Sequence, residues 1–192
     1  MNILIVYAHP NKKSFNAALK EAVIEQLKEL DYDVRVRDLY EIQFDPVLKE
    51  DNYTEFYQTN APEDILYEQK EISWADVLIY IFPTWWTGMP AIMKGYFDKV
   101  FTNGFAFRFT EKGAVGLLDG KRALIFQTTG LSEEDLKPKQ LIAAMETSFD
   151  LGILHYCGVN ILTHKFYYSL PYLDQDSKKR VIQEVKDQLI MI

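Results

Sequence analysis

The chain has 192 residues, 48% of them hydrophobic, which is enough for one domain that buries roughly 70% of its unfolded surface. Its 21 Lys and Arg residues against 28 Asp and Glu residues give a net charge of −7, which disfavours nucleic acid and anionic membranes as partners. The single cysteine, Cys157, excludes an internal disulfide, and with three histidines it supplies too few soft ligands for a zinc site. We therefore expect a cytoplasmic protein without a bound metal.

The beginning of the chain predicts a core strand and not a signal peptide. Its apolar run of about six residues has no charge before it, and a proline and two lysines follow. No stretch approaches the roughly 18 apolar residues of a membrane span, so no membrane insertion is expected.

Strands and helices are predicted to alternate along the chain. Residues 3–7 form a β-branched run without polar alternation, which is typical of a strand covered on both faces. Ser14 is the expected N-cap of a helix that ends near residue 30, and the alternating residues 33–38 predict a strand nearer the sheet edge. The sequence further predicts an excursion with short helical pieces at 41–60, a glycine-bearing loop at 104–120, strands at 77–82, 123–127 and 159–163, and helices at 63–73, 89–101, 141–156 and 177–190.

This order predicts a single α/β domain over residues 1–192, because parallel neighbours need crossover helices. The expected architecture is a doubly wound parallel five-stranded sheet with helices on both faces, in three layers. Ligands bind such sheets outside the carboxyl ends of the strands. The loops after Tyr7, Phe82 and Gln127 are therefore the candidate site.

The first of these loops, residues 8–16, enters a helix, where backbone N–H groups and the helix dipole favour a phosphate. The hydroxyl of Ser14 and the amide of Asn16 add donors to this anion cradle. The alternative is that Ser14 is a plain N-cap and His9-Pro10 a plain turn. The loop holds neither G-x-G-x-x-G nor G-x-x-x-x-G-K-S/T, so a nucleoside triphosphatase is disfavoured.

The second loop, residues 83–88, places Trp85 and Trp86 at the end of a buried strand. Stacking surfaces and backbone N–H groups at this position suit a flat heteroaromatic ring. Core packing or a dimer interface is the alternative role of the two tryptophans. In the third loop, the run Thr128-Thr129-Gly130 either borders the same ring or forms a simple turn.

The segments AHPNKKSFNAAL, FPTWWTGMPAIMKGYFDKVFTNGFAF, FQTTG and GILHYCG together resemble the NAD(P)H:quinone oxidoreductase family. The pattern P-x-x-W-x-G-x-P-A-x-M-K-G-x-x-D-K-V-F is the most specific part, and the resemblance extends from residue 1 to about residue 168. This flavodoxin-like group includes DT-diaphorase, bacterial modulators of drug activity and ancillary oxidoreductase subunits of potassium efflux systems.

The resemblance implies a flavin site at the three loops. It places the flavin phosphate and ribityl chain at His9, Ser14, Phe15, Asn16 and Ala17. It places the isoalloxazine ring along Pro83, Thr84, Trp86 and Thr87, with Thr128 and Gly130 at the opposite rim, and the loop neighbours Trp85, Gly88 and Thr129 complete the candidate set. Family members are homodimers with the flavin at the interface, and the expected pocket for nicotinamide and quinone contains the dimer's aromatic residues Phe107, Phe109 and Tyr156.

The implied reaction is a ping-pong, two-electron hydride transfer from NADPH or NADH through the flavin to a quinone or related acceptor. FMN is the expected cofactor for a chain this short, with FAD as the alternative. Two other functions are compatible with the family: a regulatory ancillary subunit of a potassium efflux transporter, and a flavodoxin-type electron carrier.

One departure from the family concerns the proton relay. In the DT-diaphorase branch, a Tyr and a His after the Thr-Thr-Gly segment are proposed to relay a proton, whereas residues 131–151 contain neither residue type. Either backbone dipoles and Thr128 stabilise the reduced flavin, or Tyr156 or His155 substitutes, and Tyr156 is the catalytic candidate. His155 and Cys157 are expected to pack in the core, because residues i and i+2 of a helix do not face each other as a nucleophile pair would. His164 is expected to be a surface or loop histidine.

Overall fold

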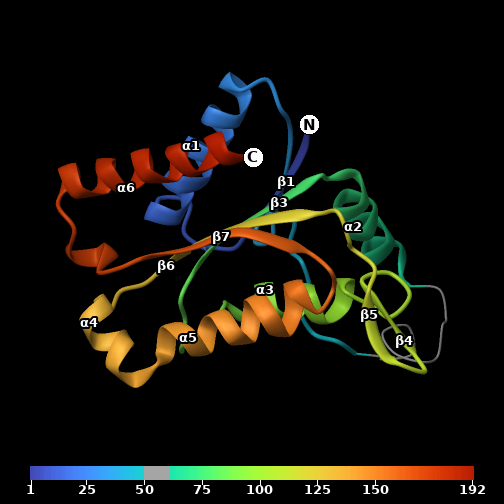
Figure 1. Ribbon diagram of the computed structural model, residues 1–192. Coiled ribbons are helices and arrows are strands. Elements are labelled where there is room, and N and C mark those ends of the chain that lie inside the picture. The colour runs from blue at the N-terminus through green and yellow to red at the C-terminus, as the bar shows by residue number, and fades with distance from the viewer. Residues whose placement is uncertain (50–60) are drawn as a thin grey trace.

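Five parallel strands form the central sheet of the computed structural model, which describes residues 1–49 and 61–192. Their order across the sheet is β2 (Asp33–Asp38), β1 (Asn2–Tyr7), β3 (Val77–Pro83), β6 (Arg122–Thr128) and β7 (Asn160–Tyr167) (Figure 1). The central strands are apolar runs because helices cover both of their faces. The alternating strand β2 lies at the sheet edge, as predicted.

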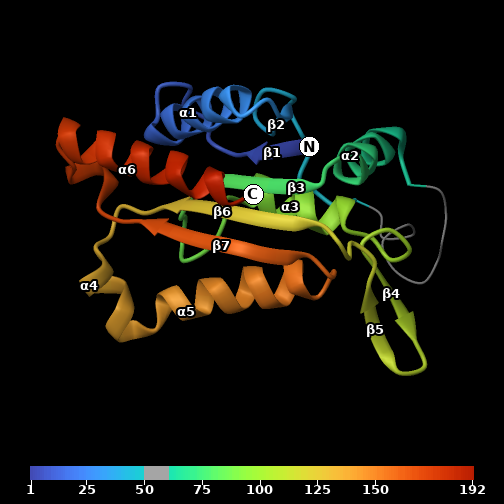
Figure 2. The same ribbon diagram turned by 45° about the horizontal axis from the view of Figure 1, so that its top comes forward.

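Helices cover both faces of this sheet. On one face lie α1 (Phe15–Glu29) and α6 (Gln175–Gln188), and on the other lie α2 (Glu63–Trp74), α3 (Ala91–Val100) and α5 (Leu141–Glu146), which continues as a π-helical segment, Thr147–His155 (Figure 2). Successive side chains of a strand point to opposite faces, so Ile3 and Ile5 pack towards α1 whereas Leu4 and Val6 pack towards α2 and α3. The predicted three-layer, doubly wound fold is confirmed.

Short elements connect these layers. A one-turn helix, α4 (Glu133–Leu136), precedes the 3₁₀ turn Lys137–Lys139, and two further 3₁₀ turns span Leu170–Tyr172 and Leu189–Met191. The predicted excursion at 41–60 contains a turn but no helix over residues 41–49, and its remainder lies outside the described residues. None of the helices in the described part of the chain is both long and apolar enough to cross a membrane.

An antiparallel hairpin occupies the region in which the sequence predicts only a glycine-bearing loop. Its strands are β4 (Phe107–Thr110) and β5 (Gly113–Gly116), and Gly113 adopts a φ of 115° at the turn, a conformation that residues with a Cβ rarely adopt. The hairpin projects from the end of the sheet at which the parallel strands begin (Figure 2). It therefore lies away from the loops that follow β1, β3 and β6.

Strand β7 runs well beyond the predicted range of 159–163 and contains a β-bulge. Ala123 and Leu124 of β6 pair with Ile161 and Thr163, so Leu162 is the extra residue. The bulge resets the alternation of side chains and places His164 opposite Ile125, on the face covered by α3 and α5. The prediction that His164 is a surface or loop residue is therefore wrong: its side chain is only 3% exposed.

The expected core packing of His155 and Cys157 is half correct. Cys157 is buried against Phe97, Phe101 and their neighbours in the core beneath α3. His155, the last residue of the π-helical segment, is exposed. A π-helix has more residues per turn than an α-helix, so a different set of residues faces the sheet. A prediction based on the 3.6-residue period of an α-helix therefore places His155 on the wrong face.

Candidate functional site

Three loops meet at the carboxyl ends of β1, β3 and β6, which are neighbours in the sheet. Backbone hydrogen bonds continue between the loops beyond the strands: Ala8 N–H donates to the carbonyl of Ile81 (3.1 Å), and Thr84 N–H donates to that of Thr128 (2.6 Å). The strand order therefore brings together three segments that are about 40 to 120 residues apart in the sequence.

A recess of about 360 Å³, called the cofactor recess below, lies between these loops. Most of the predicted cofactor residues line it: His9, Ser14, Phe15, Asn16, Pro83, Thr84, Trp85, Thr128, Thr129 and Gly130. Three residues that the sequence did not indicate complete its wall, namely Leu170 and Pro171 from the turn Leu170–Tyr172 and Lys178 from α6. No sequence motif predicts these three residues. They could be expected near the site only because the chain after β7 emerges at the same edge of the sheet.

The N-terminus of α1 forms one side of the cofactor recess. Ser14 has extended backbone geometry, and its hydroxyl accepts a hydrogen bond from the N–H of Ala17 (3.2 Å), so the predicted N-cap is confirmed. The first turn of a helix leaves other N–H groups without partners inside the helix, and the helix dipole adds a partial positive charge. This end of the recess therefore suits an anionic group.

Asn16 sits at the bottom of this side and is only 4% exposed. Its amide nitrogen donates to the hydroxyl of Thr128 (2.7 Å), which joins the first loop to the third. Its carbonyl oxygen is buried and has no hydrogen-bond partner within the described structure. Leaving a buried acceptor unpaired costs about 1–3 kcal/mol, so this atom indicates a donor that a ligand supplies.

The loop between β3 and α3 forms the opposite side. The N–H of Trp85 donates to the carbonyl of Gly88 (2.9 Å) and closes a turn in which Trp86 and Thr87 adopt φ values of 49° and 57°. Residues with a Cβ reach this left-handed region at a cost of about 1–3 kcal/mol, and such strain is concentrated at functional sites. The turn keeps Trp85 at the recess and leaves Trp86 fully exposed.

Four of the predicted cofactor residues do not line the cofactor recess. Trp86 projects into solvent, and Thr87 and Gly88 border a separate pocket of about 200 Å³ beside Phe82 and Phe149. Ala17 is buried behind Ser14 and borders a neighbouring recess instead. These four positions lie in the loops around the recess or at the start of α1, but within one chain they lie behind or outside the recess.

The neighbouring recess, also about 360 Å³, shares His9 and Ser14 with the cofactor recess and extends towards β2. Lys20 Nζ lies there, 3.4 Å from the carboxylate of Asp38. Burial lowers the pKa of Lys20, but the carboxylates of Asp38 and Glu21 outweigh it and raise the pKa overall. Lys20 is therefore charged, and in this recess the three lysines Lys12, Lys13 and Lys20 are balanced by the three carboxylates of Glu21, Asp38 and Glu41.

His9 connects the first two loops, with its ring centroid 6.3 Å from that of Trp85. The N–H of Asn11 donates to His9 Nδ1 (3.0 Å), so in the neutral ring the proton is carried by Nε2. Burial lowers the pKa of His9, which favours this neutral form at pH 7. His9 therefore offers a ligand an N–H donor without a full charge.

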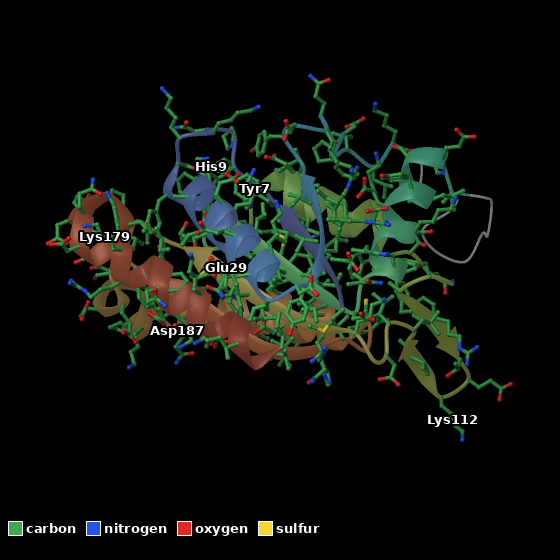
Figure 3. All side chains as sticks on the ribbon, turned by 90° about the horizontal axis from the view of Figure 1, so that it is seen from above. Tyr7, His9, Glu29, Lys112, Lys179 and Asp187 are labelled. Atoms are coloured by element: carbon green, nitrogen blue, oxygen red, sulfur yellow. The ribbon has the colours of Figure 1, made fainter. Side chains whose placement is uncertain are left out.

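The aromatic residues predicted for a substrate pocket gather elsewhere in the chain. Phe107 packs edge-on against Phe109 (5.5 Å between ring centroids) and against Tyr156 (5.4 Å). Phe107 and Tyr156 border a shallow recess of about 490 Å³ that shares no residue with the cofactor recess. Figure 3 shows His9 and Lys112 at opposite ends of the molecule, and Lys112 lies at the turn of the hairpin whose strand β4 contains Phe107 and Phe109. One chain by itself does not bring this cluster to the cofactor recess.

Comparison with known proteins identifies the family. A family model described as a flavodoxin-like fold matches residues 1–190. NAD(P)H dehydrogenase (quinone) 1 of Cavia porcellus is 33% identical over 97% of this chain and 75% of its own length. Two solved structures are also similar.

A putative quinone reductase from Klebsiella pneumoniae has a TM-score of 0.89 at 28% identity and covers 98% of this chain, which spans 83% of that chain. An NAD(P)H:quinone oxidoreductase from Methanothermobacter marburgensis has a TM-score of 0.85 at 29% identity and covers 97% of this chain, which spans 96% of that chain. Together with the strand order and the position of the site, these similarities show that the chain belongs to the NAD(P)H:quinone oxidoreductase family, within the flavodoxin-like fold.

Proposed function

We propose that the chain is a flavin-dependent NAD(P)H:quinone oxidoreductase that binds its flavin in the cofactor recess. The observation that carries this proposal is the buried, unpartnered carbonyl oxygen of Asn16, in a recess bordered by a helix N-terminus on one side and an aromatic loop on the other. A flavin has hydroxyl and N–H donors for this acceptor and a phosphate for the helix end. The residues present therefore fit the group that the family implies.

The phosphate is assigned to the first loop. Ser14 and the first turn of α1 supply neutral donors, and Lys178 of α6 supplies a charge on the same recess. Phe15 and Asn16 are assigned to the ribityl chain, as the sequence predicts. Ala17 contributes through its N–H, which holds the Ser14 hydroxyl in place, and not through direct contact.

The ring is assigned to the second and third loops. Pro83, Thr84 and Trp85 line one side of the recess and Thr128 to Gly130 the other, so a flat ring would meet an aromatic surface together with hydroxyl and backbone donors. A bound flavin supplies two-electron transfer between a nicotinamide and a quinone. The task of the chain is to exclude water and to direct donors towards the rim where negative charge grows.

We further propose that the working form is a homodimer. Phe107 and Tyr156 border a recess that shares no residue with the cofactor recess, and Phe109 and Tyr156 are 48% and 41% exposed. Trp86 is fully exposed beside the cofactor recess. A second copy that packs its aromatic cluster over this recess would cover both sets and form one closed pocket for the nicotinamide and the quinone.

The hydroxyl of Tyr156 from the second copy is the proposed proton donor, and Thr128 with the backbone dipoles is the alternative. Tyr156→Phe removes this hydroxyl and keeps the ring that packs on Phe107. If Tyr156 is the donor, turnover falls roughly 10²-fold while flavin affinity stays within twofold. Unchanged turnover assigns the role to Thr128 and the backbone.

The experiment that tests the proposed function identifies the bound group and its reaction together. The purified protein is heated, the released flavin is identified by chromatography, and the holoprotein is assayed with menadione and either NADH or NADPH. FMN in the supernatant and quinone-dependent oxidation of a nicotinamide support the proposal. A protein that takes up neither FMN nor FAD contradicts it, and flavin binding with negligible turnover favours a regulatory subunit or an electron carrier.

Asn16→Ala tests the site itself. Loss of a buried acceptor and of its bond to Thr128 is expected to raise the Kd for FMN by roughly 10- to 100-fold. Asn160→Ala, at the exposed start of β7, is the matched control and should leave the Kd unchanged. Equal FMN affinity of the two variants would place the flavin elsewhere.

A further inference from the structure

A chain of buried polar side chains runs through the protein behind the cofactor recess. Asp150 Oδ1 lies 2.9 Å from His164 Nδ1, and His164 Nε2 lies 3.1 Å from Gln127 Oε1. Gln127 Nε2 in turn donates to the hydroxyl of Thr84 (2.7 Å), which lines the cofactor recess. These four residues, called the Asp150–Thr84 chain below, connect the π-helical segment, β7, β6 and the end of β3.

The surroundings hold this chain in one place. The ring of His164 stacks on Phe166 at 4.4 Å and meets the edge of Phe149 at 6.1 Å. The bulge in β7 turns His164 towards the same face as Gln127, and both side chains are almost fully buried. Apolar side chains would fill this space without the free-energy cost of burying polar groups. We therefore expect the Asp150–Thr84 chain to do more than fill the core.

The donors and acceptors of the chain allow two arrangements. In the first arrangement, Gln127 Oε1 accepts a hydrogen bond from His164 Nε2–H, and Gln127 Nε2–H donates to the hydroxyl oxygen of Thr84. The hydroxyl hydrogen of Thr84 can then be donated to a ligand in the cofactor recess. Both ring nitrogens of His164 then face acceptors, so the His164–Asp150 pair holds one extra proton. In the second, without that proton, Nδ1–H donates to Asp150, the Gln127 amide is reversed, and Gln127 Oε1 accepts the O–H of Thr84.

We propose that the Asp150–Thr84 chain sets the direction of the Thr84 hydrogen bond, so that a proton on the His164–Asp150 pair makes the Thr84 hydroxyl a donor to the bound flavin. His164 and Gln127 are thus positioning residues, and they act on the cofactor through Thr84. The inference rests on the proposed function, because it requires a flavin in the cofactor recess. A donor stabilises negative charge, so the protonated chain favours reduced over oxidised flavin.

Other charged groups lie near the pair. The recess that borders His164 is lined by five charged residues from α4, the turn after it, α5, β7 and α6: Glu133, Lys137, Glu146, Lys165 and Glu184. Lys137 Nζ lies 3.7 Å from Glu133 Oε1, and Lys165 Nζ lies 3.6 Å from Glu184 Oε1. Among the described residues, Glu146 is the carboxylate of this recess that forms no ion pair with a lysine.

The test compares the redox potential of the bound FMN with the protonation of His164. Nitrogen NMR of the oxidised holoprotein follows the His164 ring, assigned by variants among the three histidines. We expect a plot of the midpoint potential of the holoprotein against pH to change slope at the pH at which the His164–Asp150 pair loses its extra proton. In Gln127→Met, which keeps the length of the side chain, His164 should still titrate but the change of slope should vanish.

At a pH below that step, Gln127→Met should also lower the preference for reduced over oxidised FMN by roughly tenfold, or about 30 mV for two electrons. Thr84→Val should reproduce this loss, and Thr84→Ser should restore the wild-type value because it keeps the hydroxyl. Gln183→Met makes the same exchange on the exposed face of α6 and should change nothing.

A second variant tests the inference independently in case Gln127→Met folds poorly. Asp150→Asn keeps the shape of a partly exposed side chain, and it should move both the His164 titration and the change of slope to lower pH. If FMN binds and turns over but its potential is unaffected in Gln127→Met and Thr84→Val, the inference is overturned and the proposed function stands. If no flavin binds to the wild-type protein, the proposed function fails first.

Discussion

Single residues of the first loop combine a structural role with a binding role. The Ser14 hydroxyl caps α1 through the N–H of Ala17 and also lines the cofactor recess. Ser14→Ala should therefore lower the stability of the apoprotein by about 1 kcal/mol, or roughly 2–4 °C in Tm, and raise the Kd for FMN about five- to tenfold.

Ser132→Ala is the matched control for this variant, because Ser132 caps α4 in the same way and does not line the recess. Thermal unfolding should detect a similar or smaller loss of stability, while an FMN titration should show no change. Equal FMN affinities of the two alanine variants would reduce Ser14 to a plain N-cap.

Cys157 illustrates a residue whose environment removes its usual chemistry. Burial raises the pKa of its thiol to about 12, so at pH 8 the reactive thiolate is on the order of 10⁻⁴ of the total. We expect the native protein to react with a disulfide reagent at least a hundred times more slowly than the unfolded chain. A rapid reaction in the native state, followed by absorbance of the released thiol, would show that Cys157 is accessible.

The sequence predicts the recess residues that lie at the end of a strand or in the segment after it, and it misses those that depend on three-dimensional detail. Ser14 and Asn16 follow β1 and Thr128 ends β6, and these two strands flank β3, so topology alone brings the residues to the same edge of the sheet. His164 faces Gln127 only because of a bulge at Leu162, which leaves no mark in the sequence. Lys178 reaches the recess because α6 returns to the same edge, and no motif surrounds it.

At the scale of elements, α3 packs unusually close to the chain after β2. A Cβ on Gly95 would lie 2.2 Å from the carbonyl oxygen of Pro46, and the neighbouring Asp45 carbonyl accepts a hydrogen bond from Lys99 (2.8 Å). Gly95→Ala should gain about 1 kcal/mol of helix propensity but lose more through overpacking against backbone. Urea unfolding should show a net destabilisation of about 1–3 kcal/mol.

Gly152→Ala is the control in the π-helical segment. Its Cβ would meet only the Thr147 carbonyl oxygen at 3.4 Å, an ordinary contact, so stability should be unchanged or slightly higher. If Gly95→Ala proves as stable as Gly152→Ala, the close approach of Pro46 to α3 is not maintained in solution.

The elements that the sequence predicts best are those with a strong period. All five parallel strands and the principal helices appear near their expected positions, because a buried strand is a continuous apolar run and an amphipathic helix repeats every 3.6 residues. The hairpin β4–β5 is largely exposed and rich in glycine, so its period is weak. The π-helical segment does not have the 3.6-residue period of an α-helix, and for that reason the prediction that His155 is buried is wrong.

At the scale of the whole molecule, the separation of the cofactor recess from the aromatic cluster leads to a prediction about assembly. At an FMN concentration that fills the wild-type recess but not the weakened recess of Asn16→Ala, this variant lacks cofactor, and the double variant Phe109→Ala with Tyr156→Ala lacks the aromatic cluster. Each should be nearly inactive alone. If each site combines one recess with the partner's cluster, refolding an equal mixture should restore about one quarter of the wild-type activity, because half of the dimers carry one intact site.

Light scattering of the mixture should show dimers throughout. Activity no higher than the mean of the two separate variants would mean that each chain forms its site alone. The mass of a monomer at assay concentrations would contradict the dimer directly.

Anaerobic rapid mixing of the FMN-loaded protein with NADPH, or with NADH, followed by menadione, tests the proposed oxidoreductase activity directly. We predict that the flavin absorbance band bleaches on the time scale of turnover when the nicotinamide is added, and returns when menadione is added. A band that stays unbleached with both nicotinamides, or that bleaches but is not restored by the quinone, would contradict the proposed oxidoreductase.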